Sequence, residues 1–308
     1  MTLNDWIQNL IPLPQNIDWH EILRDSSSPF STISSEPLAN LVEKSVAIEG
    51  IAAHLPQFLP ILLSCGTPET ALTQLINFSE AFNAKSGSDF NWNRPYTYAL
   101  LHIFGRSNFL ANRLKRNPQL AEQLLESPFL RKKKSLVKME TELWKKIEQH
   151  PEFSLAEFKN ILRRYKYEEY LRITVRDLAQ LCPFQDTLEE LSSIAACCLR
   201  AALSGISKYE LGIKQYATSK SFPDSTEIDC RESTPFRKEK RQELFPFTIL
   251  GMGKLGGNEL NYSSDIDLIF VHDYEPLSGN SERDNKLRMK TARILIDVMG
   301  DVTEEGFL

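Results

Sequence analysis

The feature that most constrains this chain is the short distance between a glycine-rich run and two aspartates. The run Gly251-Met-Gly-Lys-Leu-Gly-Gly257 follows an apolar segment, and only Asn258 to Ser264 separate it from Asp265. A dinucleotide-binding fold needs a crossover of at least about 10–12 residues, and its ribose-binding acid lies roughly 20 residues beyond the glycines. The spacing here allows one or two helical turns, which excludes that fold. A P-loop is excluded as well, because Leu255 follows the lysine where Ser or Thr is required.

The aspartates favour a different chemistry. Residues i and i+2 of a strand point to the same face, so Asp265 and Asp267 are expected to project together, about 6–7 Å apart at their Cα atoms. Two carboxylates at this spacing can bind hard divalent cations, which also hold phosphate oxygens during an in-line displacement. An isolated Asp-x-Asp is more often a solvated strand start. The glycine loop directly upstream favours the catalytic interpretation, because its backbone N–H groups can approach a phosphate.

The first two thirds of the chain predict an all-helical domain. Strand-like alternation is absent, and helix start signals recur, among them Thr67-Pro68, Ser107, Ser154 with Glu157, and Asp186 with Glu189. Gly105 is expected to stop one helix. The expected helices are residues 37–51, 68–82, 96–104, 108–116, 155–181 and 187–207.

The pattern changes after a polar, proline-containing stretch. We expect a helical domain at residues 1–216, a linker at 217–243 and a second domain at 244–308. In the second domain we expect strands at 245–250 and 265–272, a helix at 284–299, and a third strand beginning at 306–308. The fold class is therefore mainly α with an α+β part, whose mixed sheet is incomplete at its C-terminal end.

Two clusters of charged residues can be interpreted as structural, and one of them also as functional. Residues 168–177 carry Glu169, Arg172 and Arg176 on one helix face, which predicts a solvated ion-pair ladder or, more sharply, a partner or phosphate surface. The basic run Arg131 to Lys134 is interpreted as a solvated helix end.

Composition excludes several classes of protein. The net charge of −5 argues against a broad nucleic-acid-binding face. The most apolar stretch, residues 51–65, is interrupted by His54, Pro56 and Pro60 and is too short to span a membrane. No secretory signal opens the sequence, and none of the five cysteines forms a CxxC pair, so we expect reduced thiols and a cytoplasmic location.

The glycine loop, short connection and Asp-x-Asp occur in the order found in polymerase-β-like nucleotidyltransferases. More specifically, the glycine run, Glu259-Leu-Asn261 and Ser263-Ser-Asp-Ile-Asp-Leu-Ile-Phe270 resemble the signature of glutamine-synthetase adenylyltransferases, which are bifunctional adenylylating and deadenylylating enzymes. Tyr170-Leu-Arg-Ile173, Arg176-Asp-Leu178, Leu191-Ser192 and Thr303-Glu-Glu-Gly-Phe307 also resemble that family. The resemblance runs from about residue 106 to the end, and the sequence before the aspartates is similar to the N-terminal half of those enzymes.

The resemblance implies roles for individual residues. Asp265 and Asp267 would be catalytic ligands of Mg²⁺ or Mn²⁺. The phosphate loop would comprise Gly251, Gly253, Lys254, Gly256 and Gly257, with Ser264 bracing the loop or the first carboxylate. The N-terminal half of the family removes AMP from a tyrosine of glutamine synthetase by phosphorolysis, giving ADP, and the C-terminal half transfers AMP from ATP. Implied partners are glutamine synthetase and the PII signalling protein.

The family's third carboxylate lies on a strand within an Asp-Leu-Arg-Leu-Arg-Pro segment, and this sequence ends at Leu308, before that segment. The expected metal site is therefore two thirds of a triad. One alternative hypothesis is a truncated, catalytically inactive fragment that only binds a partner protein. Another is a nucleotidyltransferase with a different acceptor, chosen by the helical domain.

Overall fold

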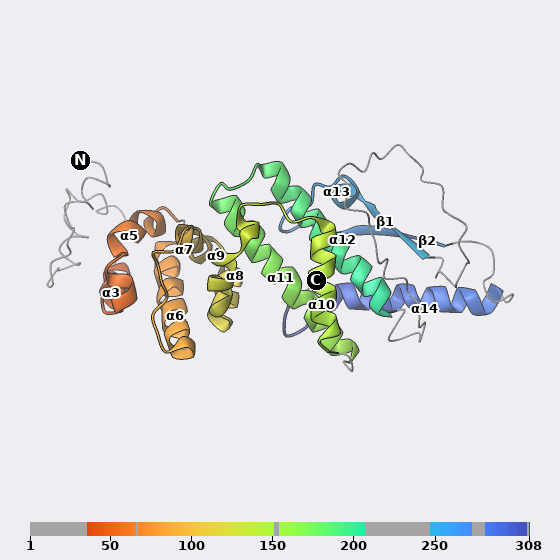
Figure 1. The fold of residues 1–308 in the computed structure, drawn as a ribbon, viewed down its shortest axis with the longest axis horizontal. Helices are drawn as coiled ribbons and strands as arrows, with labels where there is room; N and C mark the ends of the chain where they lie inside the picture. The colour runs from red at the N-terminus through yellow and green to blue at the C-terminus, as the bar shows by residue number, and fades with distance from the viewer. Residues whose placement is uncertain (1–35, 66, 151–153, 207–246, 273–280, 307) are drawn as a thin grey trace. The chain divides into compact units, whose positions relative to one another are not determined.

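The computed structural model describes residues 36–65, 67–150, 154–206, 247–272, 281–306 and 308. Most of these residues are helical, and Figure 1 shows the order of the elements. The predicted linker at 217–243 lies outside the described residues. The described residues contain no helix that is both long and apolar enough to cross a bilayer.

Contacts divide the chain into two compact units. The first unit comprises residues 1–132 and 171–183, and the second comprises residues 133–170 and 184–308. The helix α11 (Leu155–Leu178) continues from the second unit into the first. The helices α10, α12 and most of α11 thus group with the sheet, whereas the sequence pattern placed all helices before residue 216 in a domain of their own.

The secondary-structure elements described in the first unit are all helices. Its elements are α3 (Glu36–Val46), α4 (Glu49–Ala52), α5 (Leu55–Leu63), α6 (Pro68–Ser86), α7 (Thr97–Arg106), α8 (Asn108–Arg116), α9 (Gln119–Glu126) and the 3₁₀ helix η1 (Pro128–Leu130). Aromatic rings of Phe78, Phe82, Phe90 and Trp92 pack edge-on or tilted in its core. Leu171, Val175 and Ala179, at the C-terminal end of α11 and just beyond it, complete that core.

Two predictions about helix ends in this unit had different outcomes. Ser107 caps α8 as predicted, since its hydroxyl accepts from the N–H of Leu110 at 3.3 Å. Gly105 was predicted to stop a helix, but α7 continues through it to Arg106. A Cβ at Gly105 would collide with the Cys65 side chain, so this glycine serves close packing between segments.

The charged residues at the C-terminal end of α11 are buried. Arg172 and Arg176 are 3% and 1% exposed, and both donate to the carbonyl of Phe129 at 3.2 Å. Glu169 is 4% exposed and pairs with Lys134 at 2.6 Å. The predictions of a solvated ladder and a phosphate surface are therefore wrong for these α11 residues. The predicted solvation of the basic run is confirmed for Arg131, Lys132 and Lys133, which are exposed, and wrong for Lys134. The partners of the buried charges lie some 35–47 residues away in the sequence, which local spacing does not reveal.

The second unit combines helices with a small sheet. Its helices are α10 (Leu136–Glu148), the first part of α11, α12 (Phe184–Gly205), the short α13 (Gly253–Gly256) and α14 (Ser281–Gly300), and its strands are β1 (Phe247–Met252) and β2 (Asp267–His272). The strands pair antiparallel, with Phe247 opposite His272 and Met252 opposite Asp267. The described residues form one sheet, which has these two strands, and the expected mixed sheet remains a prediction.

The core of this unit lies between the helices and one face of the sheet. Met139 and Leu143 of α10, Phe158 and Leu162 of α11, Cys197 and Cys198 of α12, and Leu295 and Val298 of α14 form one buried cluster. Ile249 of β1 and Phe270 of β2 pack against it. The helix predicted at 284–299 is confirmed, including the inward face formed by Ile294, Leu295 and Val298.

One other prediction in this unit was wrong. Asp186 was expected to cap α12, but it lies in the first turn of that helix, which begins at Phe184, and its carboxylate pairs with Lys133. The third strand expected to begin at 306–308 remains a prediction, because residue 307 lies outside the described residues. Before it, Thr303 and Gly306 form a bridge, and Gly306 has a φ of 101°, a conformation that suits glycine in a turn.

Candidate active site

The pairing of the two strands brings the glycine run beside the aspartates. Met252 ends β1 opposite Asp267, the first residue of β2. The chain turns immediately after Met252 into α13, a single helical turn. The adjacency inferred from the sequence is therefore produced by the register of one hairpin (Figure 1).

A different contact explains each glycine in and next to this turn. Gly251 lies within β1, and a Cβ there would press on the Leu255 side chain. Gly253 has a φ of 53°, and its Cβ position lies 3.5 Å from Oδ2 of Asp267, so the backbone passes directly beside that carboxylate. A Cβ on Gly256 would lie 2.6 Å from the carbonyl oxygen of Gly251, so no side chain fits there without backbone movement. The loop thus keeps an open backbone next to Asp267.

The residues after the turn close it back on itself. The N–H of Gly257 donates to the carbonyl of Gly253 at 2.9 Å, and the N–H of Glu259 donates to the carbonyl of Lys254 at 2.8 Å. The side chain of Lys254 is exposed. Its predicted role, adding positive charge to the loop, remains a prediction.

The two aspartates are exposed at the start of β2. Asp265 was expected to lie in the strand, but β2 begins at Asp267, so Asp265 precedes it. The alternation nevertheless extends upstream: Asp265 and Asp267 are exposed, whereas Ile266 and Leu268 are half-buried. Both carboxylates are therefore accessible, and their projection toward one another remains a prediction. Neither has a hydrogen bond or an ion pair within the described part of the chain, so their oxygens are available as acceptors.

Ser264 organises the loop before the aspartates. Its hydroxyl donates to Oδ1 of Asn261 at 2.8 Å and accepts from the N–H of Asn261 at 3.1 Å. The N–H of Ser263 also donates to Oδ1 of Asn261, at 3.0 Å. These bonds agree with the predicted bracing of the loop, and contact of Ser264 with a phosphate remains a prediction.

Helices α11 and α12 hold this loop in place through one hydrogen bond and one aromatic contact. The N–H of Leu260 donates to the hydroxyl of Ser192 on α12 at 3.1 Å, and Leu260 itself is buried. The ring of Tyr262 meets the ring of Tyr170 on α11 edge-on, with centroids 6.0 Å apart. Ser192 and Tyr170 entered the sequence argument through the family resemblance alone, because nothing in local spacing predicts contacts across 68 and 92 residues.

The two carboxylates fit a hard divalent cation. Ionised carboxylates are acceptors only, and Mg²⁺ is commonly held by one or two carboxylates together with water and substrate phosphates. Asp265 and Asp267 supply two such groups beside an open glycine backbone. The described residues contain no cluster of three or more His, Cys, Asp or Glu that would enclose a metal ion. The arrangement therefore suits a cation shared with a phosphate ligand.

Comparison with known proteins matches most of the chain to one family. Residues 97–308 match the family model described as glutamate-ammonia ligase adenylyltransferase. A bifunctional glutamine synthetase adenylyltransferase/adenylyl-removing enzyme of Shewanella loihica is 31% identical over 219 residues, covering 69% of this chain and 20% of the relative. The protein of the same name from Hahella chejuensis is 32% identical, covering 68% and 20%.

A third relative extends the match toward the N-terminus. The protein of the same name from Thioalkalivibrio sulfidiphilus is 25% identical over 306 residues, which covers 96% of this chain and 28% of that relative. The matched part of the chain thus spans about 20–28% of the length of these curated relatives.

Proposed function

The chain belongs to the glutamate-ammonia ligase adenylyltransferase family, and from this premise we propose that its second unit is a metal-dependent nucleotidyltransferase site. The observation that carries the proposal is the hairpin that leaves Asp265 and Asp267 exposed beside the glycine run, with the Cβ position of Gly253 3.5 Å from Oδ2 of Asp267. The matched relatives are named adenylyltransferase/adenylyl-removing enzymes, and that name supports a reaction at an adenylyl phosphorus.

Within that class we propose the removal reaction. The sequence between the glycine run and the aspartates is similar to the N-terminal, deadenylylating half of the family. In this reaction inorganic phosphate attacks the phosphorus of an AMP group esterified to a tyrosine of glutamine synthetase. The bond to the tyrosine oxygen breaks, that oxygen gains a proton, and ADP is released. Transfer of AMP from ATP would belong to the full-length enzyme.

Each residue of the site has a defined task in this proposal. Asp265 and Asp267 would hold Mg²⁺ or Mn²⁺, which neutralises charge on the phosphate oxygens. The backbone of the loop from Gly251 to Gly257 would approach those oxygens near Gly253, which lies beside Asp267, and the exposed Lys254 would add positive charge. Asn261 and Ser264 fix the turn that presents Asp265. A cytoplasmic location and regulation through the PII protein follow from the same family inference.

A phosphorolysis assay tests the proposal. The chain is incubated with adenylylated glutamine synthetase, inorganic phosphate and Mg²⁺, and ADP is measured. We expect the wild type to form ADP. Asp265→Asn should reduce this activity by at least about a hundredfold, because mutating a residue that only supports a metal ligand already lowers activity 10–100-fold, and losing the ligand itself should lower it more. The control Asp297→Asn changes an exposed aspartate of α14 and should leave ADP formation unchanged. Equal activity of wild type and Asp265→Asn would contradict the proposal.

A second candidate function is favoured by one observation. The described residues provide two carboxylates and no third His, Cys, Asp or Glu near them for a metal. A chain of this kind can bind glutamine synthetase without acting on it. Binding of glutamine synthetase in a pull-down, combined with no ADP release, would select this alternative.

A further inference from the structure

The outward face of the two-stranded sheet carries apolar side chains. Leu250 and Met252 of β1 are 46% and 43% exposed, and Ile269 and Val271 of β2 are 47% and 43% exposed. We call these four residues the outer apolar face. When one face of an antiparallel sheet packs on a core, the other face is normally polar. Single exposed apolar side chains are common in proteins, whereas a contiguous group of them indicates a binding surface.

The register of the strands makes this group contiguous. Leu250 lies directly opposite Ile269, at the centre of the hairpin. Side chains directly opposite each other share one face of a sheet, with Cβ atoms about 4.5–5.5 Å apart. The outward pairs are Thr248 with Val271, Leu250 with Ile269, and Met252 with Asp267. Asp267 carries the one charge among these six positions, so the surface beside this carboxylate is uncharged.

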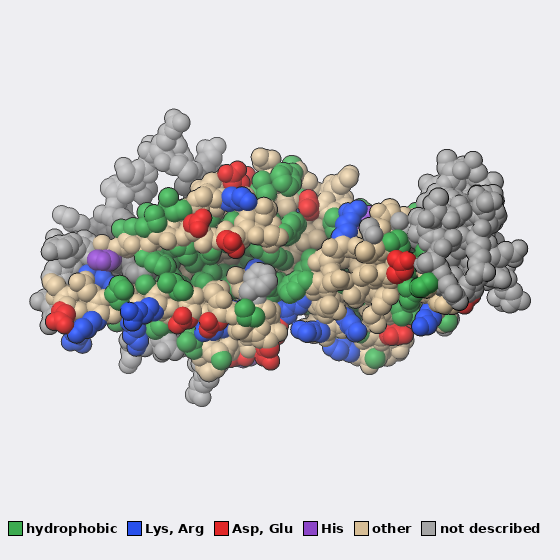
Figure 2. All heavy atoms as spheres, turned by 180° about the vertical axis from the view of Figure 1, so that it is seen from behind, with side chains coloured by type: hydrophobic (Ala, Val, Ile, Leu, Met, Phe, Trp, Pro, Cys, Tyr) green, Lys and Arg blue, Asp and Glu red, His purple; other side chains and the backbone are tan. Residues whose placement is uncertain are grey.

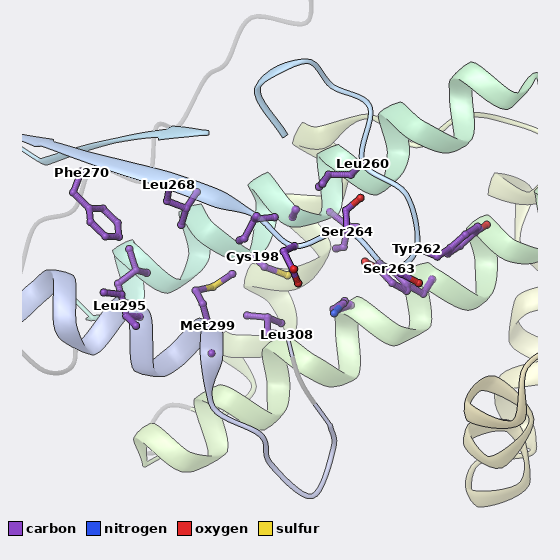
Figure 3. Close-up of a pocket in the computed structure, with 18 residues that line it drawn as sticks. Cys198, Leu260, Tyr262, Ser263, Ser264, Leu268, Phe270, Leu295, Met299 and Leu308 are labelled. Atoms are coloured by element: carbon purple, nitrogen blue, oxygen red, sulfur yellow. The ribbon is translucent and has the colours of Figure 1, made fainter. Parts of the chain in front are cut away.

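The core of this unit uses the other face of the same strands. Ile249 and Phe270 pack against the buried cluster formed by the helices. In Figure 3, Leu268 and Phe270 extend from β2 toward Leu295 of α14, beside a cavity of about 640 Å³. The outer apolar face belongs neither to that cluster nor to the lining of the cavity. Its apolar side chains are therefore not explained by packing within the described part of the chain.

The outer apolar face is continuous with the proposed metal site. Met252 lies opposite Asp267, and Ile269 follows two residues further along β2, about 6–7 Å from Asp267 at their Cα atoms. The glycine loop lies in the other direction along the hairpin, because β1 ends at Met252 and passes directly into α13. The carboxylate of Asp267 thus separates two unlike surfaces, the glycine loop beyond the end of β1 and the apolar face along the strands.

An in-line displacement directs the two ends of a substrate to these two surfaces. The attacking and leaving oxygens lie on opposite sides of the phosphorus in such a reaction. In the proposed reaction the attacking group is inorganic phosphate, an anion suited to backbone N–H groups of the glycine loop and to Lys254. The leaving group is a tyrosine side chain, which then lies on the side of the outer apolar face. An aromatic ring gains from burial against apolar side chains there.

We propose that the outer apolar face binds the leaving-group side of the substrate, namely the ring of the AMP-bearing tyrosine and apolar side chains beside it in the polypeptide. The inference rests on the proposed function, which fixes where the phosphorus lies. It defines the substrate class as a tyrosine flanked by apolar residues. Burial of those flanking side chains on Leu250 and Ile269 supplies affinity, whereas charged neighbours would lose water without gaining a partner.

Two fluorescently labelled peptides that carry AMP on a tyrosine test the proposal. One has leucine on both sides of the tyrosine and the other has serine. Their binding to the purified chain is measured by fluorescence anisotropy with Mg²⁺ and without phosphate, so that no AMP is removed. We expect the leucine peptide to bind about tenfold or more tightly than the serine peptide, because its flanking side chains bury apolar area. The double variant Leu250→Thr with Ile269→Thr, which keeps residues suited to strands, should reduce this preference to about twofold or less.

Two further variants serve as a control and as a reserve. Met289→Gln changes an apolar residue of α14 that is 58% exposed and lies outside the outer apolar face, so the preference should stay as in the wild type. Thr248→Val adds an apolar side chain opposite Val271 and should tighten binding of the leucine peptide. This gain keeps the test decisive if the double threonine variant folds poorly.

Asparagine at both Asp265 and Asp267 separates this inference from the proposed metal site. That variant should weaken both peptides by the same factor and keep the preference for leucine, because it removes contacts to the phosphate alone. Unchanged binding of both peptides would contradict the metal site and leave the assignment of the outer apolar face standing. Equal binding of the two peptides by the wild type, binding of neither, or a full preference in the Leu250 and Ile269 variant would overturn the inference.

Discussion

Single glycines in this chain are explained by what a side chain would touch. A Cβ added to Gly256 would lie 2.6 Å from the carbonyl oxygen of Gly251, so the backbone would have to move to admit a methyl group. Gly300, at the end of α14, has nothing within 4 Å of its Cβ position. The sequence shows both as glycines and does not distinguish them, because the difference arises from tertiary contact.

This difference predicts unequal effects of one methyl group. Gly256→Ala should lower the free energy of unfolding by about 1–3 kcal/mol, the usual cost of overpacking, because the added Cβ collides with backbone. Gly300→Ala should change it by less than about 0.5 kcal/mol, as expected for a site without contacts. Urea unfolding monitored by circular dichroism measures both. Equal stability of the two variants would show that the turn after β1 is not packed as described.

The charged residues of α11 show the limit of sequence reasoning at the residue scale. Their spacing correctly places Glu169, Arg172 and Arg176 on one helix face, but that face is buried. Lys134, which pairs with Glu169 and with Glu142 at 2.8 Å, was expected to be solvated. Burial of these charges is stabilised by carbonyl and carboxylate partners on other elements, and a single sequence does not identify those partners.

At the scale of elements, a local capping signal predicts some helix starts and misplaces others. Ser154 accepts from the N–H of Glu157 at 3.2 Å, as its position in the sequence indicated. Asp186 has the same pattern but lies inside α12, which begins two residues earlier at Phe184, and its carboxylate pairs with Lys133. A capping pattern alone therefore does not fix where a helix begins.

A buried arginine joins α11 to the end of α14. Arg163 is fully buried and donates to the carbonyls of Gly306 at 2.9 Å and Val298 at 3.1 Å, and also to that of Asp301. Lys159, one turn earlier on α11, pairs with the carboxylate of Asp301 at 2.5 Å. These carbonyls lie at a helix end and in a turn, where intrahelical donors are lacking. Arg163 therefore fixes the position of residues 298–306 on α11.

Removing this guanidinium should loosen the end of α14. We expect Arg163→Met to lower the free energy of unfolding by on the order of 3 kcal/mol, since several buried carbonyls lose their donor. Arg164→Met, at the adjacent residue whose side chain is 41% exposed and pairs with Glu157, should cost less than about 1 kcal/mol. Thermal unfolding of the two variants provides the comparison, and an equal effect would contradict the role assigned to Arg163.

At the scale of the whole chain, composition and contact divide the sequence differently. The shift in pattern near residue 244 predicted a separate second domain. In the structure two strands alone do not make a core, and Ile249 and Phe270 pack against a cluster built by α10, α11, α12 and α14. A two-stranded hairpin is marginal by itself, so the helices before residue 207 provide its support.

The surface of the described residues agrees with the mild net charge. Figure 2 shows acidic and basic side chains interspersed on the face drawn, with hydrophobic side chains between them.

The glycine run and the aspartates could be placed together from the sequence because one hairpin contains both. The cavity behind them could not, because its lining extends from Lys166 to Leu308 across several elements.

The central claim is that Asp265 and Asp267 form a divalent-cation site, and a Mn²⁺ titration followed by electron paramagnetic resonance tests it most directly. We predict that the chain binds Mn²⁺ and that the double variant Asp265→Asn with Asp267→Asn weakens binding by at least about tenfold, because each change removes a charged ligand. Asp297→Asn should bind as the wild type does. Equal Mn²⁺ affinity of the wild type and the double variant, or no binding by the wild type, would contradict the account.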